Sequence, residues 1–194
     1  MNHDLSPRAA EIAMRARSLL AAGGYNGFSY ADISESVQIS KASIHHHFPS
    51  KAELVRTVLV LYREEARVGI AALEQQIPDP LAQLEAYTGY WARCIRDGTS
   101  SFCICAMLAA ELPAIPREVA DEVRGHFQDL GAWLASVLAK GAAQGLFFLR
   151  TSPEEEAMTF MATVHGAMLS ARAYGDPGVF ETVVQPLMRR LTSR

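Results

Sequence analysis

Apolar side chains recur three and four residues apart along almost the whole chain, the spacing that places them on one face of an α-helix. No stretch shows the sustained alternation of apolar and polar residues that a half-buried strand needs. Glycines and prolines gather at a few points, such as 78–80, 113–116 and 175–178, and divide this pattern into segments. The pattern predicts an all-α protein of about nine helices.

The first fifty residues are predicted to fold into three helices. The first begins at Pro7, a residue favoured in the first turn, and ends at the Gly23–Gly24 pair. Ser29, with a carboxylate three positions later, marks the start of a second helix of about two turns. Ser40 is a natural N-cap for the third helix, Lys41–His47, which ends before a proline.

A longer fourth helix follows, and five more are predicted after it. Ser50 and Glu53 form a capping-box pattern where the fourth helix starts. Between residues 119 and 137 the apolar residues form one continuous stripe, so this helix is expected to pack against its neighbours.

Two short helices joined by a tight turn match the helix-turn-helix motif, whose second helix enters the major groove of DNA. In this chain the helix that would enter the groove is the third predicted helix, in the run 40–47. Its Ile44 is expected to face inward with Phe48. Its outward residues can read base edges, because lysine suits guanine, a hydroxyl suits any base and a methyl suits thymine. These outward residues are Lys41, Ala42, Ser43, His45 and His46. Lys51, at the start of the next helix, is expected to hold a phosphate.

The run His45–His47 also has a plainer interpretation, a solvated helix end. Successive residues of a helix point about 100° apart, so three in a row do not converge on one metal ion. We therefore expect no metal site here, and nothing in the sequence indicates a cofactor.

Composition and charge fit a globular protein that touches DNA at one end. Hydrophobic residues make up 49% and charged residues 20% of the 194 residues, which excludes a disordered chain. The net charge is −3, yet the first sixty residues carry six basic against five acidic residues and the remainder twelve against sixteen. No apolar run reaches the length of a membrane span, and the start does not resemble a signal peptide, so a cytoplasmic protein without a membrane partner is expected.

The segment from Gly24 to Leu54 resembles the DNA-binding domain of the TetR family of transcriptional regulators. The resemblance rests on Gly27-Phe28-Ser29, on Ile33 and Val37, on the run 40–48 and on the run 50–54. It implies a three-helix DNA-binding domain over residues 1–50 and a helical ligand-binding and dimerisation domain over residues 51–194. It places at DNA-backbone positions Ser29, Tyr30, His45 and Lys51, and at base-reading positions Lys41, Ala42, Ser43 and His46.

Two residues depart from the family pattern. Gln38 stands in the turn where the family usually has glycine, which raises the expectation of a turn without a left-handed residue. His45 stands where the family usually has tyrosine. An imidazole in that place would make the DNA affinity sensitive to pH below about 7.

The last two predicted helices are the expected dimer interface, forming a four-helix bundle with a second copy as the resemblance implies. The segment 155–174 mixes methionines with small residues that permit close packing, and the final helix is apolar along one side. The interface is assigned to Ala162, Gly166, Ser170, Val183 and Leu187. The alternative is that both helices belong only to the core of one chain.

The middle helices carry many aromatic and polarizable side chains, which suit a cavity for a small apolar or aromatic effector. The candidate lining residues are Tyr87, Trp91, Cys94, Phe102, Cys103, Met107, Phe127, Met161 and His165. The alternative is a plain core, in which His165 would be a hydrogen-bonded core histidine.

The three cysteines are expected to be reduced thiols. Inside a helix the side chains of Cys103 and Cys105 would diverge by about 200°, which disfavours a chelate or an easy disulfide. Their place after Ser100–Ser101, near a helix start, could lower a thiolate pKa. The stretch 103–112 is also similar to a TetR branch with a cysteine at that helix start, some members of which sense electrophiles or oxidants. Buried, inert thiols are the alternative.

The predicted function is a ligand-responsive transcriptional repressor. As a homodimer it would bind a palindromic operator in double-stranded DNA and leave it when a small molecule binds or a thiol is modified. The chain lacks the common motifs of hydrolases, metalloproteases and nucleotide-binding enzymes, so it is not expected to be an enzyme. The alternative is a helical partner-binding or architectural protein without specific DNA recognition.

Overall fold

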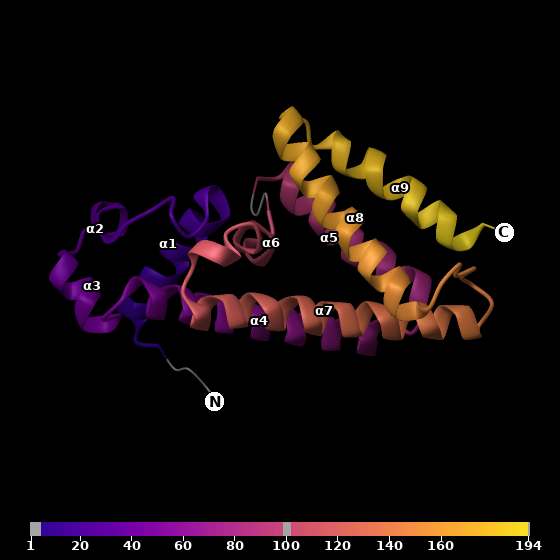
Figure 1. The fold of residues 1–194 in the computed structure, drawn as a ribbon, viewed down its shortest axis with the longest axis horizontal. Helices are drawn as coiled ribbons and strands as arrows, with labels where there is room; N and C mark the ends of the chain where they lie inside the picture. Colours follow the sequence, from indigo (N-terminus) through magenta and orange to yellow (C-terminus); the bar gives the residue numbers. More distant parts are fainter. Residues whose placement is uncertain (1–4, 99–101, 194) are drawn as a thin grey trace. The chain divides into compact units, whose positions relative to one another are not determined.

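The computed structural model describes residues 5–98 and 102–193, and these ranges are helical with no strand among them. The predicted all-α class is confirmed (Figure 1). Ser100 and Ser101, named above, lie outside the described residues. The helices are α1 (Pro7–Gly23), α2 (Tyr30–Val37), α3 (Lys41–His47), α4 (Lys51–Gln76), α5 (Pro80–Arg96), α6 (Ile104–Ala109), the short 3₁₀ helix η1 (Leu112–Ala114), α7 (Arg117–Ala143), α8 (Pro153–Tyr174) and α9 (Gly178–Thr192).

The chain divides into two compact units. The first unit takes residues 1–67 and 103–126, and the second unit takes residues 68–102 and 127–194. The long helices α4 and α7 each contribute residues to both units. The two units do not follow the order of the two expected domains along the chain, and the domain boundary after residue 50 stays a prediction.

Serine caps start α1, α2, α3 and α4 in the first unit, and those at Ser29, Ser40 and Ser50 are the caps that the sequence predicts. The Ser6 hydroxyl accepts the N–H of Ala9 where α1 begins. Ser29 forms a full capping box with Asp32 at the start of α2. The hydroxyls of Ser40 and Ser50 accept backbone N–H groups at the starts of α3 and α4. Each such cap is worth about 1 kcal/mol, because it satisfies a donor that the helix leaves unpaired.

The core of the first unit determines the rotation of α3 about its own axis. Ile44 is fully buried and Phe48 is 3% exposed, as predicted. Fully buried apolar residues of α1, α2 and α4 belong to the same core, among them Leu20, Ile33 and Leu59. Burying a side chain of this size stabilises the fold by about 1.5–3 kcal/mol. The opposite side of α3 therefore faces outward.

The turn between α2 and α3 differs from the expectation. Gln38 takes the left-handed conformation with φ 54°, and its N–H bonds to the carbonyl of Ser34. The expected turn without a left-handed residue is therefore wrong. The tight reversal needs a residue at positive φ to end α2, and glutamine fills this position despite the steric cost that its Cβ brings.

The second unit packs α8 along α9, and Figure 1 shows the two helices side by side. A capping box of Ser152 and Glu155 starts α8. The buried carboxylate of Glu156 accepts from Arg190 of α9 at 2.6 Å and from the backbone N–H of Arg150 at 3.1 Å. This pairing compensates the cost of burying a charge at the α8–α9 contact.

None of the helices in the described ranges is long and apolar enough to span a membrane.

Replacing Gln38 with glycine should raise the free energy of unfolding by about 0.5–1 kcal/mol, since glycine adopts positive φ without a Cβ clash. Urea denaturation followed by circular dichroism measures this. The matched control is Glu35→Gly at an exposed position within α2, which should lower stability by about 1 kcal/mol. A loss of stability in both variants would contradict the left-handed turn.

Candidate nucleic-acid interface and effector site

The outward face of α3 carries the residues predicted to read bases. Lys41, Ala42 and His46 are exposed and Ser43 is partly exposed. The N-cap bond from the Ser43 N–H to the Ser40 hydroxyl, 3.1 Å long, fixes the first turn. The helix thus presents an ammonium group, a methyl, a hydroxyl and an imidazole on a rigid support, which is the chemistry of base-edge recognition. Contact of these four residues with DNA stays a prediction.

Ser29 and Tyr30 have structural partners at the start of α2. The Ser29 hydroxyl donates to the Asp32 carboxylate at 2.8 Å, and the Ser29 backbone N–H donates to the same carboxylate. These two hydrogen bonds hold the pKa of Asp32 below its usual value. The Tyr30 hydroxyl donates to the carbonyl of Phe48 at 2.9 Å, and the residue is 9% exposed. Burial, with the charges of Glu53 and Tyr25 nearby, raises the pKa of Tyr30 to about 12. Tyr30 therefore fixes the end of α3, and its predicted phosphate contact remains untested.

Lys51 is held against two aromatic rings. Its ammonium nitrogen lies 4.2 Å from the ring centroid of Phe28 and 4.7 Å from that of Tyr25, and it donates to the Phe28 carbonyl. Burial lowers the pKa of Lys51, while the carboxylates of Glu111 and Asp32 oppose that shift. An ammonium group has three donors and the Phe28 carbonyl takes one, so a phosphate contact remains compatible with this geometry.

His45 is exposed on α3 with its ring 4.7 Å from that of Tyr30. Its Nδ1 lies 3.2 Å from the carbonyl oxygen of Pro49. A carbonyl cannot donate, so Nδ1 carries the proton in this contact, and the neutral ring then presents Nε2 as an acceptor. His45 could therefore donate to a phosphate through Nε2 only as the imidazolium cation.

Glu111 is a site residue that the sequence does not reveal. Its carboxylate accepts the N–H of Tyr25 at 2.6 Å, the N–H of Asn26 at 3.3 Å and the side-chain amide of Asn26 at 3.2 Å. Gly24, at φ 73°, permits this approach, since a Cβ there would overlap the carboxylate. The segment after α6 thus holds the loop between α1 and α2. No local pattern marks a contact between residues so far apart in sequence.

The predicted effector residues fall into both units. In the second unit, Tyr87 packs against Trp133 with ring centroids 5.4 Å apart, and Phe127 against His165 at 5.2 Å. Trp91, Cys94 and Phe102 are buried there, and Met161 is partly exposed. Cys103 and Met107 belong to the first unit, where Cys103 is fully buried and Met107 partly so. A cavity lined by this whole set stays a prediction.

The three cysteines are buried and form no disulfide with one another. Cys103 precedes α6 as its N-cap, so the expected divergence, which assumed both cysteines inside one helix, does not apply here. The Cys103 and Cys105 thiols are hydrogen-bonded. Burial, and then the Cys103 thiol, raises the pKa of Cys105 well above its usual value, which corrects the expectation of a lowered thiolate pKa for this residue. Tyr62 donates to the Cys103 sulfur at 3.4 Å, and His126 Nε2 lies 3.7 Å away. Among the described residues no cluster of three metal-binding side chains occurs.

The predicted dimer residues differ in exposure. Ala162 and Gly166 are exposed on α8, while Ser170 and Val183 are partly exposed. Leu187 is 7% exposed within its own chain, so it packs chiefly inside the second unit. Large apolar side chains also lie exposed on α8, namely Met158, Leu169 and Tyr174.

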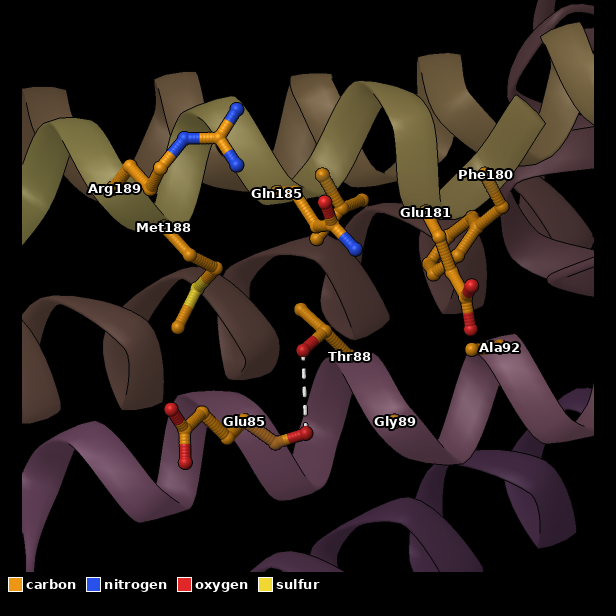
Figure 2. A pocket seen from close by; sticks show the side chains of 10 residues that line it. Glu85, Thr88, Gly89, Ala92, Phe180, Glu181, Gln185, Met188 and Arg189 are labelled. Carbon is orange, nitrogen blue, oxygen red and sulfur yellow. Dashed lines mark hydrogen bonds between the residues drawn. The ribbon is translucent and has the colours of Figure 1, made fainter. Parts of the chain in front are cut away.

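A groove of about 350 Å³ lies between α5 and α9 in the second unit (Figure 2). Thr88 and Ala92 line it from α5, and Phe180 and Glu181 line it from α9. Glu181 also pairs with Arg96 at 2.8 Å. None of the predicted effector residues lines this groove.

Both the helix-turn-helix segment and the C-terminal helices of this chain match models of known protein families. The family model described as "Bacterial regulatory proteins, tetR family" matches residues 12–58, and that described as "Tetracyclin repressor-like, C-terminal domain" matches residues 80–187. The chain belongs to the TetR family. The helix-turn-helix domain, the helical C-terminal domain and the assignment as a DNA-binding transcriptional regulator are thereby confirmed.

Individual TetR relatives agree with this assignment. A TetR-family transcriptional regulator from Agrobacterium tumefaciens is 54% identical, with a TM-score of 0.94 over 96% of this chain and 98% of that chain. IcaR from Staphylococcus aureus, a negative transcriptional regulator of the biofilm operon icaADBC, is 26% identical over 141 residues, 67% of each protein. Reduced NemR from Escherichia coli has a TM-score of 0.81 over 95% of this chain and 97% of that chain, and its 17% identity shows the shared fold alone.

The raised pKa of Tyr30 should make stability depend on alkaline pH. The folded protein keeps this phenol protonated up to about pH 12, whereas the unfolded chain ionises near pH 10. The stabilisation is therefore complete below pH 10 and is lost as the pH rises to 12. Urea denaturation should show the advantage of the native protein over Tyr30→Phe shrinking by about 1–2 kcal/mol across that window. The exposed control Tyr174→Phe should show no such trend.

Replacing Glu111 with alanine should lower the free energy of unfolding by about 2 kcal/mol, because the N–H groups of Tyr25 and Asn26 lose a charged acceptor. Chemical denaturation measures this. The control Glu118→Ala, at an exposed position of α7, should change stability by less than about 0.5 kcal/mol. Equal effects of the two substitutions would show that Glu111 does not hold this loop.

Proposed function

We propose that this chain is a transcriptional repressor that binds a palindromic operator as a homodimer and leaves it when a small apolar or aromatic effector binds. The observation that carries this proposal is the orientation of α3. With Ile44 and Phe48 buried, Lys41, Ala42, Ser43 and His46 face outward and are assigned to base contacts. IcaR, a negative regulator, supports repression rather than activation.

Ser29, Tyr30, His45 and Lys51 are assigned to the DNA backbone. All four lie at the start of α2, at the end of α3 or at the start of α4. Phosphate contacts fix the register of a protein on the duplex without reading sequence. Because His45 Nδ1 faces a carbonyl, the neutral ring offers Nε2 only as an acceptor, so a hydrogen bond donated to a phosphate requires the charged ring.

The dimer is assigned to the exposed side of α8 with part of α9. Ala162 and Gly166 are small and exposed, and a Cβ at Gly166 would meet nothing within 4 Å of its own chain, so this side leaves room for a partner helix to approach closely. Met158 is 58% exposed and Leu169 is 57% exposed, and such a strip of apolar side chains favours burial against a second copy. Ser170 and Val183 extend the interface, and Leu187 supports it from inside the chain.

The effector is assigned to a small molecule rather than to a thiol-reactive compound. Cys103 and Cys105 are fully buried, and the raised pKa of Cys105 disfavours the reactive thiolate. The aromatic side chains of α5, α7 and α8 offer the apolar surroundings that such a molecule needs. No catalytic role, cofactor or metal is part of this proposal, and we place its action in the cytoplasm, where the DNA lies.

The test is DNA binding by the protein and by a variant of the α3 face. In a mobility-shift assay with DNA from upstream of its own reading frame, the protein should bind specifically, and more weakly at 200 than at 50 mM salt. Lys41→Ala should weaken specific binding by about 5- to 100-fold and relax sequence preference. Lys140→Ala, at an exposed position of α7, is the control and should bind like the native protein. Absence of specific retardation at micromolar protein would contradict the proposal.

A further inference from the structure

Three helices of the second unit bring aromatic rings together. Tyr87 of α5 meets Trp133 of α7 at 5.4 Å and Phe160 of α8 at 6.5 Å between ring centroids. Phe127 of α7 meets His165 of α8 at 5.2 Å. Phe127 and Trp133 are six residues apart on α7, which corresponds to roughly 9 Å along the helix. A single aromatic ring with two small substituents has about this length.

Buried polar atoms without a partner lie among or beside these rings. Trp133 is 7% exposed, and its indole N–H has no hydrogen-bond partner in the described part of the chain. The same holds for Nε2 of His165. Gln83 is 4% exposed, and while its amide nitrogen donates to the carbonyl of Ile77, its Oε1 is left without a donor. Because buried polar groups in native proteins almost always find a partner, these atoms indicate a molecule that binds there.

These three atoms, the Trp133 N–H, Gln83 Oε1 and His165 Nε2, determine which hydrogen-bonding groups a bound molecule must carry. An indole N–H can only donate, so Trp133 requires an acceptor, and the amide oxygen of Gln83 requires a donor. Gln83 precedes Tyr87 by four residues on α5 and so lies one turn from the Tyr87–Trp133 pair. His165 can donate or accept, according to its tautomer.

Charge limits the molecule further. Among the described residues of the second unit the buried acidic side chain is Glu156, which Arg190 already neutralises, and no lysine or arginine is buried there. A charged molecule among the rings of Tyr87, Trp133 and Phe160 would lose its hydration without gaining a counter-ion. A neutral molecule does not incur this cost of losing the hydration of a charge.

We propose that the effector is a neutral, one-ring aromatic molecule with one hydrogen-bond acceptor and one donor, such as a phenolic ester or amide. Its acceptor binds the Trp133 N–H, its donor binds Gln83 Oε1, and His165 contacts a polar group towards the far end of the ring. This inference rests on the proposed function, because it names the chemical class of the molecule that the regulator senses.

Calorimetric titration of the full chain at pH 6.5 tests the class of molecule. Methyl 4-hydroxybenzoate, neutral with one donor and one ester acceptor, is the probe. 4-Ethyltoluene has a similar shape without hydrogen bonds, and 4-hydroxybenzoate has the same ring with a negative charge. The ester should bind at least tenfold more tightly than either control compound. Equal binding of the hydrocarbon, or tighter binding of the anion, would overturn the proposal.

Substitution at Trp133 tests the contact itself. Trp133→Phe keeps a ring and removes the N–H, so the ester should bind about three- to tenfold more weakly while the unliganded variant melts no lower than the native protein. Tyr90→Phe, which removes a hydroxyl from a ring that is 48% exposed on α5, should leave ester binding unchanged. Ester binding that is unchanged in Trp133→Phe would overturn the assignment.

DNA binding separates this inference from the proposed function. Suppose that the protein binds its operator DNA in the mobility-shift assay and that none of the three compounds binds at millimolar concentration. Ordered water then satisfies these atoms, so the proposed effector class is wrong while the proposed repressor function remains supported. If the ester binds as expected and specific DNA binding is absent, the site stands as a binding site, and its role as effector site is overturned together with the proposed function. Support for both requires that the ester weakens operator binding of the native protein and does so less for Trp133→Phe.

Discussion

The burial of Ile44 and Phe48 is the constraint on which the DNA-binding end of this protein depends. These two apolar side chains decide which side of α3 is covered, and hence which polar groups face outward. Tyr30 reinforces this arrangement, because its hydroxyl holds the Phe48 carbonyl where α3 ends. Recognition chemistry on the outer side of a short helix is useful only when the inner side fixes the helix rotation, since a free helix would present every side in turn.

Local signals allowed most of the fold to be predicted from the sequence. Serine caps, prolines in first turns and glycine pairs act within a few residues, so the bounds of α1 and α3 could be predicted. The same reasoning failed at Gln38, where the need for a tight reversal overrides the preference of the side chain. It also left open whether Cys103 lies inside a helix, and the structure makes this residue the N-cap of α6.

The candidate sites could be predicted only where one helix carries the whole pattern. The outward residues of α3 follow from a single run of eight residues and a family resemblance. Glu111 became evident only from the structure, since it depends on partners from a distant segment. The sequence places Trp133 among the aromatic residues of the middle helices, but sequence patterns do not reveal whether its N–H finds an acceptor.

The contact of Gly24 with Glu111 ties together two distant positions of the first unit. Any side chain at position 24 would occupy the space of the carboxylate, and a shorter residue at position 111 would leave the loop amides without an acceptor. Neither position can therefore change alone without cost. Among descendants of this protein the two residues should be inherited as a pair, and a loss of one should be followed by a compensating change at the other.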